Sequence, residues 1–122
     1  MRIHHIVPLL LLAPAVAFAQ NWSHAVQIGD DNFQVTDQHG RNLSITAQIG
    51  DDNDAATAQS GTGNASVIVQ SGDGLSQTNV QSGDYQIYSS TQVKSALPVT
   101  PVSRTTTVSG AVGSITVHFS VE

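Results

Sequence analysis

Polar and apolar positions recur along this chain with a period of about eleven residues. Segments of six residues, many with β-branched side chains at alternate positions, are separated by short segments rich in Gly, Asn and Asp. Residues 66–69, which read Ser-Val-Ile-Val, show the pattern. Such alternation indicates strands, and six residues between two breaks are too few for a helix. The pattern therefore predicts seven short strands, at residues 22–27, 33–38, 43–48, 54–59, 65–70, 76–81 and 87–92.

Gln sets the phase of this repeat. It ends every predicted strand, with gaps of 11, 10, 11, 11, 11 and 11 residues: Gln27, Gln38, Gln48, Gln59, Gln70, Gln81 and Gln92. Gly follows two residues later in all but the last unit, at Gly29, Gly40, Gly50, Gly61, Gly72 and Gly83. Asn closes four of the turns, at Asn32, Asn42, Asn53 and Asn64. A chain poor in aromatic residues also fits partial disorder, but disorder does not require a phase held over six intervals.

The repeat has a direct physical interpretation. Gly and Asn tolerate positive φ, so each polar segment predicts a tight turn. Two strand–turn units make one rung of a flat coil, and rungs stack about 4.8 Å apart. Equivalent Gln and Asn side chains then form hydrogen-bonded amide ladders along the coil axis, and a polar interior becomes possible. The expected fold class is all-β, an amyloid-like β-solenoid of stacked two-strand rungs over residues 20–92.

The parity of the motif residues predicts which side chains face inward. If Gln and Asn point inward, the same-parity neighbours do so too: Ser44, Thr46, Ala55, Thr57, Ser66 and Ile68. Alternate strands then form two sheets, and the outward residues of the first sheet are mostly apolar: Trp22, Val26, Leu43, Ile45, Val67, Val69 and Ile87. A soluble monomer does not normally leave such a stripe bare. Either a second filament or the rest of the chain is expected to cover it.

The repeat stops after Gln92, and residues 93–122 form a different segment. Pro98 and Pro101 mark a linker. Residues 105–109 and 114–121 alternate well, and residues 110–113 start and end with Gly, which predicts a C-terminal β-hairpin. This tail either covers the apolar stripe or caps the open end of the solenoid, and the sequence leaves both interpretations open.

Acidic residues gather in the turns on one edge of the predicted coil. Stacking brings five of them into one column: Asp30, Asp31, Asp51, Asp52 and Asp73. Like charges at the spacing of successive rungs repel, so the column is expected to slow assembly near neutral pH. Alternatively, Asp is present only as a turn former. The spacing differs from the nonapeptide calcium repeat, so no metal site is expected.

The first 19 residues have the pattern of a secretory signal peptide. Arg2 precedes an apolar run from Ile6 to Phe18, and Ala17-Phe18-Ala19 fits a cleavage site that leaves Gln20 as the first mature residue. An uncleaved anchor is the alternative. The expected organisation is therefore signal 1–19, repeat 20–92 and tail 93–122. Residues 20–122 hold three basic and nine acidic residues, a net charge of −6 that argues against nucleic acid as a partner.

No sequence pattern indicates catalysis. Cys is absent, and His24, His39 and His118 lack the spacing of metal ligands. Nucleophile elbows, phosphate-binding loops and paired catalytic carboxylates are also absent from the sequence. We therefore expect no enzyme, no cofactor and no catalytic residue.

The repeat resembles the curlin repeat of bacterial curli subunits. Residues 48–59, Gln-Ile-Gly-Asp-Asp-Asn-Asp-Ala-Ala-Thr-Ala-Gln, match its Gln-x-Gly-x2-Asn-x-Ala-x3-Gln core fully, and residues 59–70 match with Ser66 in the Ala place. The leading Ser of the family motif is replaced by Asn, the separate N-terminal export segment is short or missing, and the tail does not match. The similarity covers roughly residues 22–92.

The resemblance implies a secreted structural subunit that polymerises with itself into extracellular, cell-surface amyloid fibres of the biofilm matrix, with roles in adhesion and aggregation. It also implies export through an outer-membrane pore and seeding by a nucleator subunit. The sequence does not decide between the major subunit and the nucleator. A soluble β-solenoid binding module and an accessory factor whose tail is the active part remain the alternatives.

Overall fold

The computed structural model describes residues 20–95, 97, 101–110 and 112–122. The predicted signal peptide and its alternative, an uncleaved anchor, lie outside these residues, as does Pro98. Over the described part, the elements are seven strands, and no helix is long and apolar enough to cross a membrane. The strands are β1 (Trp22–Ile28), β2 (Phe33–Ile49), β3 (Asp54–Ser71), β4 (Ser76–Ser82), β5 (Ile87–Val93), β6 (Val102–Gly110) and β7 (Gly113–Val121).

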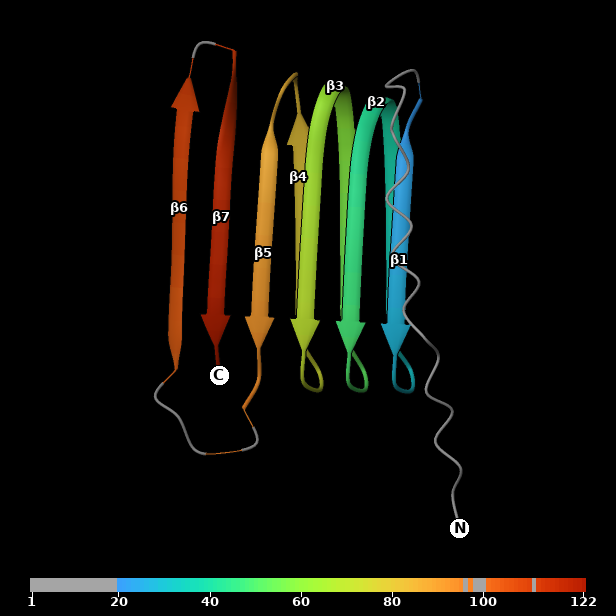
Figure 1. Cartoon of the computed structure of the whole chain (residues 1–122), viewed down its shortest axis with the longest axis vertical. Coiled ribbons are helices and arrows are strands. Elements are labelled where there is room, and N and C mark those ends of the chain that lie inside the picture. Colours follow the sequence, from blue (N-terminus) through green and yellow to red (C-terminus); the bar gives the residue numbers. More distant parts are fainter. Residues whose placement is uncertain (1–19, 96, 98–100, 111) are drawn as a thin grey trace.

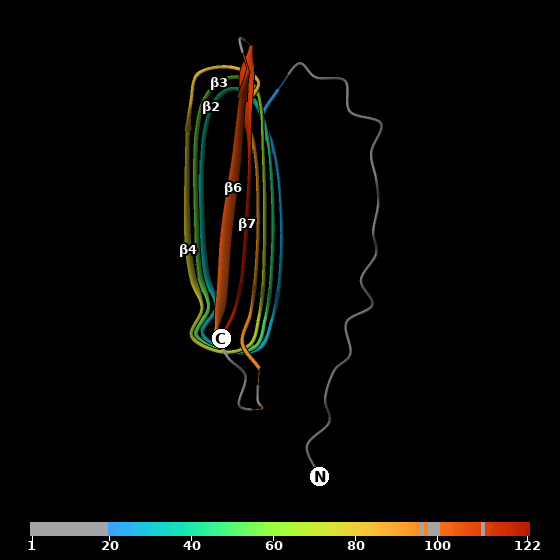
Figure 2. The ribbon, with the colours of Figure 1, turned by 90° about the vertical axis from the view of Figure 1, so that its left-hand side faces the viewer.

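The strands wind into a flattened β-solenoid, as the repeat predicts (Figures 1 and 2). One wall, which we call sheet one, holds β1, residues 43–49 of β2, residues 65–71 of β3 and β5. The other wall, sheet two, holds residues 33–38 of β2, residues 54–59 of β3 and β4. All of these neighbours are parallel and in register, so that Gln27 pairs with Gln48 and Gln38 pairs with Gln59.

Two of the predicted turns do not interrupt the strands. The sequence predicts separate strands at 33–38 and 43–48, but β2 runs without a break from Phe33 to Ile49, and β3 likewise passes through residues 60–64. The bends stay paired because they stack on each other, with Gly40 opposite Gly61 and a register shift only after Arg41. Pairing between rungs therefore continues around this edge of the coil, which repeat spacing alone does not reveal.

The interior of the solenoid is polar. The six residues predicted to face inward from their parity are all buried, with exposed fractions of 3% or less: Ser44, Thr46, Ala55, Thr57, Ser66 and Ile68. Among the described residues, the buried hydrophobic ones are Ala55, Ile68 and Leu75, whereas the buried Gln, Asn, Ser and Thr side chains are far more numerous. The predicted inward parity is confirmed.

The predicted hairpin forms, and it extends sheet one at its C-terminal end. β7 pairs in parallel with β5, with Ile115 opposite Ile87, and β6 pairs antiparallel with β7. Figure 2 shows the hairpin leaning from sheet one toward the space between the two walls. Of the two interpretations left open for the tail, the structure shows the one in which the hairpin adds strands at the end of the coil, and it does so on sheet one alone.

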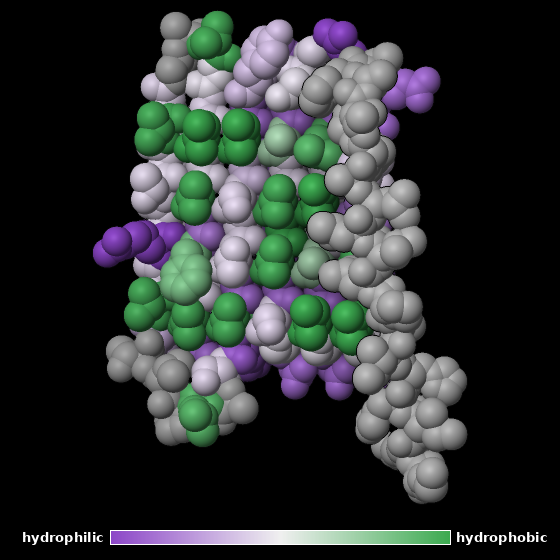
Figure 3. All heavy atoms as spheres, viewed as in Figure 1, coloured by the Kyte–Doolittle hydropathy of each residue, from purple (hydrophilic) through white to green (hydrophobic). Residues whose placement is uncertain are grey.

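The outward face of sheet one remains largely apolar and continues onto the hairpin (Figure 3). Ile87, Ile115, Val117 and Phe119 are each exposed by 43–48%. In-register pairing places equivalent apolar residues side by side, so they form rows that run along the coil axis rather than along one strand. The predicted stripe is thus present, and the hairpin lengthens it instead of covering it.

Glycine is required where the corners of successive rungs touch. The six turn glycines all have φ between 110° and 125°, a region closed to other residues. A Cβ atom added to Gly50 would lie 2.2 Å from the carbonyl oxygen of Gly72 in the next rung. The corners are therefore packed backbone against backbone.

We expect Gly50→Ala to lower the free energy of unfolding by about 3 kcal/mol or more, because it adds a forbidden φ to a clash with backbone. Gly74→Ala is the matched control: its φ is +69°, and the nearest atom to an added Cβ is Lys94 Nζ at 3.9 Å. This control should cost about 1 kcal/mol. Urea unfolding of both variants measures the difference, and equal midpoints would contradict the close packing of the corners.

Candidate functional site

Two columns of Gln side chains run through the interior, one beside each sheet. In the first, Gln27, Gln48 and Gln70 each donate from Nε2 to Oε1 of the next Gln, ending at Gln92, over 2.7, 3.0 and 2.9 Å. In the second, Gln38 donates to Gln59 and Gln59 to Gln81, over 2.7 Å in both cases. Identical side chains stacked in register therefore satisfy one another along the coil axis.

From Gln38 onward, the second amide hydrogen of each column Gln links the two sheets. Gln59 Nε2 also donates to the carbonyl oxygen of Leu43 at 3.1 Å, and Gln70 Nε2 donates to that of Asp54 at 3.0 Å. Each of these acceptors lies on the opposite sheet. A single amide thus links its own rung to the next and sheet one to sheet two, which an apolar side chain does not do.

Asn side chains link successive rungs at the two edges of the coil. Asn32 Oδ1 accepts from the backbone N–H of Asn53, and Asn42 Oδ1 accepts from that of Asn64. Their amide nitrogens bond to turn carbonyls, as in the 2.7 Å bond from Asn32 Nδ2 to Gly50 O. The columns end where Leu75 and Gln86 replace Asn, since Leu75 has no acceptor to offer a further rung.

The acids of the predicted column lie on neighbouring turns, and two of them have a bonding role. Asp51 Oδ1 accepts the backbone N–H of Asp30, and Asp73 Oδ1 accepts that of Asp51, both at 2.8 Å. Asp31 and Asp52 instead hold φ values of 55° and 57°, which Asp tolerates better than most residues. All five carboxyl groups belong to exposed residues. The geometry accounts for Asp as a turn former and also stacks the charges.

Asp84 and Lys94 also belong to this system, although the repeat pattern alone did not single them out. Asp84 Oδ1 accepts the N–H of Thr62 at 2.7 Å on the opposite edge of the coil. Its position three residues after Gln81 matches that of Asp30 after Gln27, so the repeat phase could have found it. Lys94 Nζ donates to the Asp73 carbonyl at 2.9 Å and places a positive charge at the end of the acidic column.

The described residues show no arrangement for metal binding. Nowhere among them do three or more His, Cys, Asp or Glu side chains gather closely enough to hold a metal ion. His39 bonds to its neighbour Asp37 at 3.3 Å, and His118 Nδ1 lies 2.7 Å from Thr105 Oγ1 on the hairpin. What the arrangement offers chemically is therefore an ordered set of hydrogen-bond donors and acceptors on strand edges and turns.

Replacing an interior Gln should be far more costly than replacing a terminal one. Gln59→Ala removes the acceptor for Gln38 and the donor for Gln81 and leaves a buried cavity, so we expect a loss of about 3 kcal/mol. Gln27→Ala is the control, because Gln27 is exposed at the start of its column, and it should cost about 1 kcal/mol or less. Urea unfolding measures both, and similar losses would show that the amide columns contribute little.

Comparison with known proteins gives one family match. Residues 50–78 match the family model of the curlin associated repeat. The comparisons with curated proteins and with solved structures gave no match. The matched segment runs from the turn after Gln48 through β3 into β4. It includes residues 50–59 of the motif that spans residues 48–59. The match supports the resemblance to curlin repeats, and this chain is a β-solenoid in which residues 50–78 match the curlin associated repeat.

Proposed function

We propose that this protein is a secreted structural subunit that polymerises into extracellular, curli-like amyloid fibres of the biofilm matrix. The observation that carries the proposal is the in-register parallel pairing of equivalent rungs, in which each rung is a template for the next. A curlin repeat suggests a curli-type subunit, and the amide columns supply the physical means of continuing from copy to copy. Repeat and solenoid are structural features rather than features of an enzyme.

The open ends of the solenoid support self-association. β1 and residues 33–38 of β2 form the first rung, and among the described strands nothing pairs with their outer edges. Exposed parallel edges offer unpaired N–H and C=O groups that invite a further strand. Export through an outer-membrane pore and contact with a nucleator subunit are part of the same proposal, and adhesion of the cell surface would be the role of the finished fibre.

One observation favours an alternative function as an accessory factor. The hairpin closes sheet one with an antiparallel strand, and such an end does not continue a parallel solenoid. A subunit of this kind would join a fibre through its first rung and then stop growth. The fibre subunit and the chain terminator differ in whether the pure protein forms fibres by itself.

A Thioflavin T time course with electron microscopy on purified residues 20–122 tests the proposal. We expect a lag phase followed by fibres whose diffraction shows the spacing of about 4.8 Å between rungs. A seeded reaction should lose the lag phase, because preformed ends replace nucleation. A protein that stays monomeric at all concentrations, and that shortens the fibres of another subunit, would contradict the proposal in favour of the terminator.

We further propose that the stacked acids slow assembly near neutral pH. Asp51→Asn with Asp73→Asn removes two stacked charges while keeping the Oδ1 acceptors, so we expect a shorter lag without loss of stability. The control pair is Asp37→Asn with Asp54→Asn, which changes the net charge equally at exposed positions outside the turns. Equal lag times for the two double variants would leave Asp as a turn former only.

A further inference from the structure

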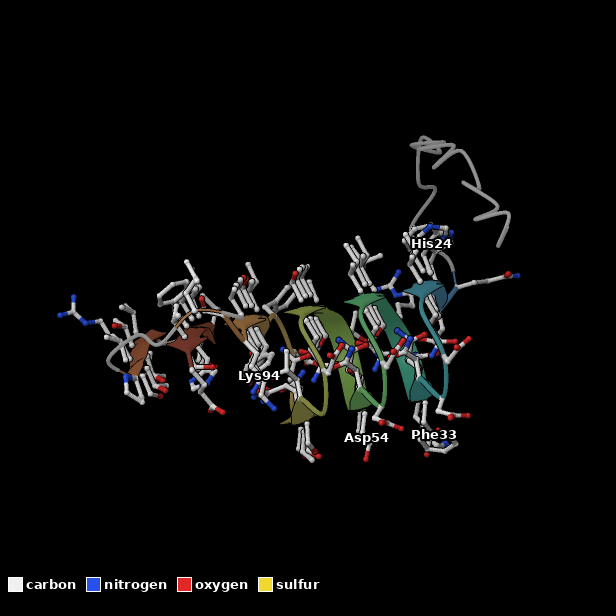
Figure 4. All side chains as sticks on the ribbon, turned by 90° about the horizontal axis from the view of Figure 1, so that it is seen from below. His24, Phe33, Asp54 and Lys94 are labelled. Carbon is white, nitrogen blue, oxygen red and sulfur yellow. The ribbon has the colours of Figure 1, made fainter. Side chains whose placement is uncertain are left out.

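The C-terminal end of the solenoid is stepped. Sheet two ends at β4, which pairs with β3 and with no other described strand, whereas sheet one continues through β5, β7 and β6. Seen along the strands, the space beside β4 and opposite the inner face of β5 holds no backbone (Figure 4). One strand of sheet two, which is half of a two-strand rung, is therefore missing at this end.

A hollow of about 290 Å³ marks this place, between β4 on one side and β5 and β7 on the other. Gln81, Tyr88 and Thr116 are among its lining residues. Tyr88 lies in the column of Ser44 and Ser66, and its hydroxyl accepts from Gln77 Nε2 at 2.5 Å. Inward-facing polar groups of the two sheets thus line a hollow. If the coil continued, its next strand would fill this hollow.

The number of half rungs determines which strand would fit. The repeats supply four strands to sheet one and three to sheet two, an odd total. Continuing the coil beyond β5 therefore puts the next strand on sheet two, beside β4. In a second copy stacked end to end, the first strand is β1, so that copy would be turned by half a turn about the coil axis relative to the first.

The side chains of β1 fit this position. The repeat phase aligns Gln27 of the second copy with Gln81, which ends its column, and Gln27 begins a column with an exposed side chain. Besides Gln27, the inward-facing residues of β1 are Ser23 and Ala25, which are small. They leave room for the ring of Tyr88, which replaces the serines of the earlier rungs.

The hairpin occupies the following position. In the continued coil, residues 33–38 of the second copy would pair with β5, where β7 now lies with Ser120 opposite Gln92. Ser120 Oγ is buried without a hydrogen-bond partner, at the place where Gln38 of the second copy would extend the column. Gly113 packs on the Tyr85 carbonyl, 2.1 Å from an added Cβ, much as Gly61 packs on Gly83. β7 therefore mimics a strand of the repeat, with a poorer fit to the ladder.

We propose that the edges of β4 and β5 are the docking surface for the first rung of a second copy, in a half-turn arrangement, and that the hairpin β6–β7 competes for the β5 edge. The inference rests on the proposed self-assembly and specifies its contact. Docking exchanges one pairing, β5 with β7, for two, β4 with β1 and β5 with residues 33–38. The unpaired edge of β4 provides the gain that displaces the hairpin.

Cysteine cross-linking tests the arrangement, because the chain contains no Cys. The half-turn arrangement pairs His24 of one copy with Thr78 of another, both facing outward, whereas unrotated stacking pairs His24 with Ser89. Adjacent parallel strands hold such Cα atoms within the range that a disulfide spans. Mixed His24→Cys and Thr78→Cys proteins should cross-link about tenfold more than mixed His24→Cys and Ser89→Cys proteins, because misplaced pairs are out of reach.

The cross-links separate this inference from the proposed function. Fibres with the His24–Ser89 link, or with equal yields of both links, would overturn the half-turn arrangement and leave fibre formation intact. Soluble oligomers with the His24–Thr78 link but no fibres would support the docking and overturn the polymer. If neither fibres nor cross-links form, both the docking arrangement and the proposed polymer are overturned.

Removing the hairpin tests the competition. Deletion of residues 98–122 should shorten the lag and raise the yield of the His24–Thr78 link. Gly113→Val retains the hairpin strands but places a side chain against the Tyr85 carbonyl, so it should have the same effect to a smaller degree. Unchanged lag times for both variants would overturn the competition.

Discussion

The stacking of identical amides in register is the interaction on which the rest of this structure depends. A buried Gln costs free energy unless its donors and acceptor are all satisfied. Here Gln59 meets that condition because Gln38 and Gln81 flank it in the column and the Leu43 carbonyl accepts its second amide hydrogen. A shift of one residue in any rung would break both columns and turn the apolar stripe inward. The polar interior therefore enforces one register.

The same constraint explains why the corners and the end of the repeat look as they do. Rungs held at ladder distance bring their bends into backbone contact, so Gly29 and Gly50 leave no space for a Cβ. Where the ladder residues change, stacking stops: Leu75 and Gln86 end the Asn columns, and Lys94 stands in the place of a turn glycine. The hairpin is the next element along the chain after the repeat motif ends.

Period and parity were enough to predict the rungs, the inward residues and the hairpin, because each depends on local spacing. Ser66 and Ile68 are buried as their distance from Gln70 requires. Other features depend on the neighbouring rung and were not predictable. The bend at Gly40 stays within a strand only because Gly61 pairs with it, and the Asp51 carboxylate bonds an N–H of another turn. The position of β7 against β5 likewise depended on which edge was left open.

The polar interior also affects how the fold responds to temperature. Exposure of apolar surface on unfolding raises the heat capacity, by about 0.45 cal/mol/K per Å², and exposure of polar surface lowers it, by about 0.26. Among the described residues, Ile68 and Leu75 are the large apolar side chains that are fully buried, whereas the fully buried amides and hydroxyls are many. Its heat-capacity change is therefore small for its size. The stability curve of each rung is correspondingly flat, and the folded chain loses little stability in the cold.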